Sequence, residues 1–233
     1  MSSFTPFSAT HAATLAAGTA AIALLITLGR RPGRPRQIAS GLLAFACLAS
    51  YSLNQLGWST CGDPIALDNS LPLHLCDIAA IIAGFALLTR QPTLRELTYF
   101  WGLAATVQGI VTPAVGYGFP HPVFLTFFWQ HFAIVGAALF LPLALGWHPR
   151  RPLHHTVLRV VLWTELYLVV MLPVNFLLGT NFGFLARKPD NPSLLDHLGP
   201  WPWYILSLHL VAFLLLAMLA LPFARRQNCH VGL

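Results

Sequence analysis

The chain alternates long apolar stretches with short polar segments. Seven stretches consist mainly of Ala, Leu, Val, Ile and Phe, and each has the length of about 20 residues that an α-helix needs to cross a bilayer. These stretches are 10–29, 38–57, 71–89, 95–113, 123–146, 155–179 and 201–224. The pattern predicts an all-α membrane bundle of about seven transmembrane helices. The connecting segments are short and contain no linker or repeat, so we expect a single domain over residues 1–233.

The composition supports membrane insertion. Hydrophobic residues make up 56% of the chain and charged residues only 9%, whereas about one quarter of a soluble domain is charged. No basic residue precedes the first stretch, and Arg30 and Arg31 follow it. A secretory signal peptide has the opposite arrangement, so this stretch is predicted to be a retained helix.

The basic residues define an orientation. If the N-terminus is outside and the C-terminus inside, eleven of the thirteen Lys and Arg residues lie on the cytoplasmic side, as the positive-inside rule expects. This distribution accounts for the net charge of +6 without nucleic-acid binding, which we do not expect. Arginine outnumbers lysine twelve to one, which favours a GC-rich bacterial source and therefore the bacterial cytoplasmic membrane.

Two predicted outer loops are unusual. Segment 113–122, PAVGYGFPHP, has three prolines and two glycines, which is typical of a tight or partly re-entrant turn able to cover a cavity from outside. Segment 181–203 is polar, aromatic and rich in proline, and it contains Arg187 and Lys188, which oppose the positive-inside trend. These two cations are candidate contacts for a phosphate group. Local pairing with Asp190 or Asp196 is the alternative.

Polar side chains gather toward the outer side of five different stretches. Such residues are costly in hydrocarbon and mark function when they gather, although a single one often only joins helices by hydrogen bonds. We therefore expect an intramembrane polar site. Its candidates are His74, Cys76, Asp77, Gln108, His131, Asn175 and His209.

Cys76 and His131 are the candidate catalytic pair. If the third helix starts near Pro72, Cys76 lies about 8 Å below its start, and His131 lies about 13 Å below Pro122. A thiol and an imidazole at similar depths can act as nucleophile and base. His74 and Asp77 share a helical face that Cys76 does not share, so a partner for the thiol must come from another helix.

The remaining candidates are predicted to contact substrate. Gln108 and Asn175 carry amides that could donate to a developing oxyanion. His74, Asp77 and His209 complete the substrate-binding set, with Arg187 and Lys188 at its edge.

Two other uses of these residues remain open. Cys61 falls on the same side as Cys76, so the two could form a disulfide. His74, Asp77, His131 and His209 are chemically suited to a metal such as zinc, but their spacing matches no metal motif, and we expect no cofactor.

Four motifs carry a resemblance to a known family: PLHLCDIA at 72–79, YFWGLAATVQGIVTP at 99–113, FFWQH at 127–131, and LPVNFLLGTNFGFLARKPDNPSLLDHLGPWPWY at 172–204. The chain resembles the YwaF-type integral membrane proteins of bacteria. That family is distantly similar to a vertebrate transmembrane cysteine acyltransferase acting on ether phospholipids. The resemblance implies that Cys76 and His131 match the cysteine and histidine proposed as its catalytic pair.

Three functions are consistent with the sequence. The first is a membrane-embedded acyltransferase or lipid hydrolase that acts on a membrane phospholipid through Cys76 and His131. The second is a transporter or binding protein for a small polar or zwitterionic solute, although the polar residues are off-centre and no repeat is visible. The third is an assembly subunit whose polar residues bind a partner helix.

Overall fold

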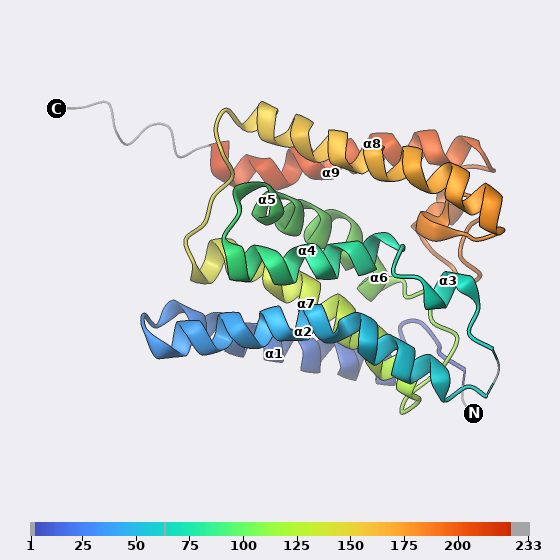
Figure 1. Cartoon of the computed structure of the whole chain (residues 1–233), viewed down its shortest axis with the longest axis horizontal. Coiled ribbons are helices and arrows are strands. Elements are labelled where there is room, and N and C mark those ends of the chain that lie inside the picture. The colour runs from blue at the N-terminus through green and yellow to red at the C-terminus, as the bar shows by residue number, and fades with distance from the viewer. Residues whose placement is uncertain (1–2, 63, 225–233) are drawn as a thin grey trace.

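The computed structural model describes residues 3–62 and 64–224. The regular secondary structure in this part of the chain is helical, apart from one isolated bridge between Ser3 and Tyr117. The longer α-helices run nearly side by side along the long axis (Figure 1). They are α1 (Ala9–Arg30), α2 (Arg34–Ser59), α4 (Leu75–Thr89), α5 (Pro92–Trp101), α7 (Pro122–Ala144), α8 (Leu153–Leu178) and α9 (Trp203–Ala224). Shorter elements are α3 (Leu67–Ser70), the π-helical η1 (Gly102–Thr106), α6 (Val107–Val111), and the 3₁₀ turns η2 (Phe182–Phe184) and η3 (Leu194–His197).

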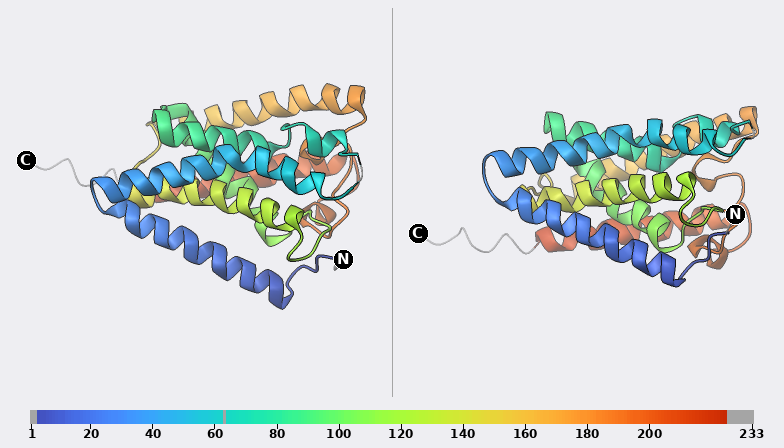
Figure 2. Two further views of the ribbon diagram at one scale, coloured as in Figure 1. Left: turned by 60° about the horizontal axis from the view of Figure 1, so that its bottom comes forward. Right: turned by 90° about the horizontal axis from the view of Figure 1, so that it is seen from below.

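The helices form three layers. Helices α8 and α9 form one outer layer, α4, α5 and α6 form the middle layer, and α1, α2 and α7 form the other outer layer (Figures 1 and 2). Helix α7 packs against α1, α2, α4 and α5, whereas α8 packs chiefly on α9 and meets the rest at α5 and η2. The pair α8–α9 therefore forms a separate wall beside the main bundle.

The predicted membrane character is supported. Five helical segments are long and apolar enough to cross a membrane: Ala9–Arg30, Leu67–Thr89, Pro122–Ala144, Leu153–Leu178 and Trp203–Ala224. The predicted stretches 38–57 and 95–113 are also helical, as α2 and as α5 continued through η1 and α6, but they are outside that set. The count of seven spans and the orientation therefore stay predictions.

The third predicted stretch begins differently from the prediction. It is broken between Ser70 and Leu75, so α4 starts three residues after Pro72 rather than before it. Neighbouring side chains satisfy the backbone of the break: Tyr51 Oη donates to the Ser70 carbonyl at 2.7 Å, and Tyr167 Oη donates to the Leu73 carbonyl at 3.0 Å. Non-helical backbone at membrane depth needs such partners. The break moves Cys76 into the first turn of its helix.

A buried carboxylate joins three elements at the opposite end of the bundle. Glu96 on α5 is 1% exposed, and its oxygens accept from Arg150 at 2.7 and 2.9 Å and from Arg159 on α8 at 2.7 Å. Thr156 Oγ1 adds a hydrogen bond at 3.1 Å. The hydrogen bonds to Glu96 hold the pKa of the Arg150 guanidinium above its ordinary value. This cluster attaches the α8–α9 wall to the main bundle.

Replacing Glu96 by Ala is expected to destabilise the protein by about 3 kcal/mol, because removing one partner of a buried ion pair leaves the other charges uncompensated. The measurement is the apparent melting temperature in detergent. Asp190→Ala removes an exposed carboxylate and serves as the control. Equal melting temperatures for the two variants would show that the cluster does not hold the layers together.

Candidate active site

A cavity of about 610 Å³ lies among the three layers. Residues of α2, α4, α6, α7, α8 and α9 line it, together with parts of the two loops 113–122 and 181–203. Ala114, Val115 and Gly116 are among its lining residues, as expected for a loop that covers a cavity. Of the predicted site residues, those in the lining are His74, Cys76, Asp77, Gln108, His131 and His209.

Asp77 connects three helices at one end of the cavity. Its Oδ1 accepts from Gln130 Nε2 of α7 at 2.7 Å, and Gln130 Oε1 accepts from Asn54 Nδ2 of α2 at 2.9 Å. Its Oδ2 accepts from the backbone N–H of His74 at 3.2 Å, at the position that caps α4. Asp77 is thus the N3 residue of a capping box as well as a link between helices. The ring of His74 packs edge-on against Phe182 at 5.2 Å between ring centroids.

His131 is held in one orientation. Its Nδ1 lies 2.8 Å from the carbonyl oxygen of Phe127, and its ring stacks on the Phe127 ring at 4.0 Å. A carbonyl oxygen can only accept a hydrogen bond, so Nδ1 carries the proton and Nε2 of the neutral ring carries a lone pair. On the opposite side, Gly109 of α6 approaches the ring so closely that an added Cβ would lie 2.7 Å from Nε2. The His131 ring is therefore held between its own helix α7 and α6, and its Nε2 is a candidate proton acceptor.

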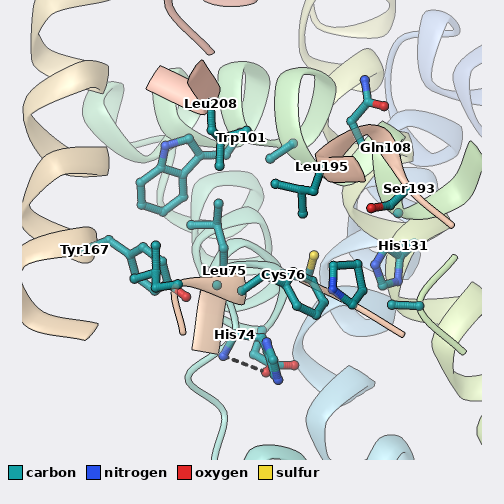
Figure 3. A pocket seen from close by; sticks show the side chains of 18 of the residues that line it. His74, Leu75, Cys76, Trp101, Gln108, His131, Tyr167, Ser193, Leu195 and Leu208 are labelled. Atoms are coloured by element: carbon teal, nitrogen blue, oxygen red, sulfur yellow. Dashed lines mark hydrogen bonds between the residues drawn. The ribbon is translucent and has the colours of Figure 1, made fainter. Parts of the chain in front are cut away.

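Cys76 is the second residue of α4, and its thiol is free. Figure 3 shows its sulfur directed into the cavity, with Trp101, Tyr167 and Leu208 on one side and Gln108, Ser193 and His131 on the other. The first turn of a helix has backbone N–H groups without intrahelical acceptors, and these favour negative charge nearby. The position suits a nucleophile better than the deeper one predicted from the sequence.

His209 lines the cavity from α9 but is already engaged. Its Nδ1 lies 2.6 Å from the Ile205 carbonyl oxygen, and its Nε2 lies 3.2 Å from Oε2 of Glu165 on α8. Glu165 also lines the cavity. This hydrogen-bonded pair lies on the wall formed by α8 and α9.

Three predicted substrate contacts lie outside the cavity lining. Asn175 is 5% exposed, and its amide oxygen and nitrogen bond the backbone of Phe182 at 2.7 and 2.9 Å, so the side chain fixes the loop instead. Arg187 is exposed and lies 3.7 Å from Asp68. Lys188 lies over the ring of Tyr204, 5.7 Å from its centroid. Arg187 thus pairs with Asp68 rather than with Asp190 or Asp196, the partners that the sequence suggested.

The disulfide and metal alternatives are not formed in the structure. Cys47, Cys61 and Cys76 are free, and Cys229 lies outside the described residues. Within residues 3–62 and 64–224 no three His, Cys, Asp or Glu side chains are grouped so that they could hold a metal ion. His209 pairs with Glu165 rather than with the other three members of the suggested metal set.

Among the polar lining residues that the sequence analysis did not assign, three are hydrogen-bonded to predicted site residues or to one another. Gln130 and Asn54 link Asp77 to α7 and α2, and Glu165 pairs with His209. Gln130 is adjacent to His131 in the FFWQH motif, and Asn54 lies near the C-terminal end of the predicted stretch 38–57. A search for every uncharged amide in an apolar stretch would have found both.

Gly109→Ala is expected to cost about 1–3 kcal/mol of stability, because the added methyl group overlaps the His131 ring in a packed interior. Melting temperatures in detergent measure the loss. Gly41→Ala is the matched control, since a Cβ at that helical glycine meets no atom within 4 Å. If the two variants have the same melting temperature, α6 does not fix His131.

Comparisons with known proteins place the chain in a family. Residues 6–220 match the model of the TMEM164 family. Neither the comparison with curated proteins nor the comparison with solved structures found a match. The narrower resemblance to YwaF-type bacterial proteins stays a prediction. Since the match extends over nearly the whole chain, this membrane protein belongs to the TMEM164 family.

Proposed function

We propose that the protein is a membrane-embedded acyl-transfer enzyme in which Cys76 is the nucleophile and His131 the base. The observation that carries the proposal is that both side chains line one cavity, with His131 held as the neutral tautomer that has a lone pair on Nε2. A thiol becomes an effective nucleophile when a base takes its proton. The resemblance to a cysteine acyltransferase, given above, points to the same pair.

The first half-reaction forms an acyl-enzyme. Nε2 of His131 takes the proton of the Cys76 thiol, and the sulfur attacks the carbonyl carbon of an ester in a membrane phospholipid. The C–O bond of the ester then breaks. The leaving oxygen takes the proton from the imidazolium ring, so a lysophospholipid departs and a thioester remains on Cys76.

The second half-reaction reverses these proton movements. The hydroxyl group of a second lipid, or of water, gives its proton to His131 and attacks the thioester carbon. The C–S bond breaks, and the thiolate takes the proton back from the ring. A lipid acceptor makes the enzyme an acyltransferase, and water makes it a lipid hydrolase.

Two features of the cavity suit the charge that develops. The backbone N–H groups in the first turn of α4 lie beside the reacting sulfur, and the amide of Gln108 lines the same cavity. Both are hydrogen-bond donors of the kind that stabilise an oxyanion. Arg187 lies 3.7 Å from Asp68, which lines the cavity, and Lys188 is its neighbour in the chain, so both are candidate contacts for a phosphate group at the rim of the cavity.

Intact-mass spectrometry of the purified protein after incubation with mixed phospholipids tests the proposal. An acyl-sized adduct is expected on the wild type and none on Cys76→Ala, and His131→Ala is expected to slow its formation by about 100-fold or more, the typical contribution of a positioned general base.

Cys61→Ala is the matched control, because it removes another free cysteine that does not line the cavity. An adduct that persists in Cys76→Ala would refute the assigned nucleophile. If the folded wild type forms no adduct and supports solute-dependent uptake into proteoliposomes, the transporter hypothesis replaces the enzyme hypothesis.

A further inference from the structure

We infer that the apolar part of the cavity along α9 is a closed binding site for one acyl chain of a membrane lipid. We call this part the acyl arm and define it by Trp101, Val161, Ala212, Leu215 and Leu216, all of which line the cavity. The inference rests on the proposed function for the chemistry at Cys76. The arm itself is argued from its length, its lining and its closed end.

The cavity along α9, of which the acyl arm is the inner part, matches one leaflet in length. The cavity lining on α9 extends from Ile205 to Leu216, eleven residues apart, which corresponds to about 16 Å at the helical rise of about 1.5 Å per residue. Half of the hydrocarbon core of a bilayer is about 15 Å thick. A lipid chain that lies along α9 would therefore be accommodated over its depth in the membrane.

The lining is apolar and has room for a chain. Ala104, Ala105 and Ala212 contribute only methyl groups to the wall. The polar group of Trp101 is turned toward α8, where its Nε1 donates to Thr164 Oγ1 at 2.9 Å. Hydrocarbon in the arm would therefore meet apolar surface without leaving the indole N–H unsatisfied.

The inner end of the arm is closed. Tyr99 Oη donates to the carbonyl oxygen of Leu219 at 3.1 Å, one turn beyond Leu216, and this bond joins α5 to α9. The ring of Tyr99 packs edge-on against Phe100 and Phe223, at 5.1 and 5.5 Å between centroids. Both of these phenylalanines are buried. A chain that enters the arm therefore meets a fixed end, and its length becomes a criterion for binding.

The mouth of the arm lies beside the nucleophile. In Figure 3, Trp101 and Leu208 lie on one side of Cys76, and His131 and Gln108 lie on the other. A chain held along α9 therefore brings its carbonyl group to the boundary between the apolar and polar parts of the cavity, where the thiol lies. The structure thus couples recognition of the chain with placement of the ester.

The test compares acyl adducts formed from equal amounts of phospholipids that differ only in chain length. Leu215→Trp fills the inner end, and Ala212→Trp fills a position one turn nearer the mouth. Both should shift the adducts to shorter chains, and Ala212→Trp should shift them further. Each methylene group excluded from the arm should lower the share of that chain about fourfold, equivalent to about 0.8 kcal/mol.

Leu214→Trp is the matched control, because Leu214 adjoins Leu215 but is 52% exposed on the surface of α9. The result that would overturn the inference is one chain-length distribution shared by all three folded variants and the wild type. If Ala212→Trp fails to fold, as judged by its melting temperature, Leu215→Trp is compared with Leu214→Trp. Shorter chains in Leu215→Trp alone support the acyl arm, and equal chain lengths in the two variants overturn it.

A second readout separates the acyl arm from the enzyme reaction. Native mass spectrometry of Cys76→Ala, alone and combined with each tryptophan substitution, gives the chain lengths of the lipid that the protein retains without turnover. The same shift toward shorter chains without an adduct on the wild type would support the arm and refute the proposed function. An adduct on the wild type whose chain length none of the tryptophan substitutions changes would support the proposed function and refute the acyl arm.

Discussion

The carboxylate of Asp77 is the interaction on which the cavity depends. A partly buried carboxylate in a membrane bundle needs hydrogen-bond donors, because an unpaired polar group in hydrocarbon costs several kcal/mol. Asp77 obtains them from α7 through Gln130 and from the capped end of its own helix through the His74 backbone. These bonds fix where α4 begins relative to α7. They therefore determine the relative positions of Cys76 and His131, which come from those two helices.

The break before α4 follows from the same requirement. Once the helix starts at Leu75, the preceding residues lose their helical partners and need others. Tyr51 and Tyr167 provide them from α2 and α8, on opposite sides of the segment. The side chains that stabilise the break thus also bring the α8–α9 wall against the reactive end of α4, and the cavity forms between these parts.

The sequence predicted the helical class and most helix bounds because apolar length determines both. It placed six site residues in one cavity because polar groups in hydrocarbon gather where they can be satisfied. It did not predict the break at 71–74, which depends on side chains far away in the chain. Nor did it show that Asn175 is used by its own loop, since that depends on the path of the backbone between Gly179 and Phe182.

Two of the three histidines that line the cavity, His131 and His209, show how local contacts rather than residue type distinguish a candidate base. His131 and His209 each have Nδ1 against the carbonyl oxygen of the fourth preceding residue, so both rings are directed by the same helical constraint. Glu165 faces Nε2 of His209, and this nitrogen already takes part in a hydrogen bond. Nε2 of His131 instead faces Gly109, which contributes no side chain. A proton acceptor needs an available lone pair, so these contacts favour His131 over His209 as the proposed base.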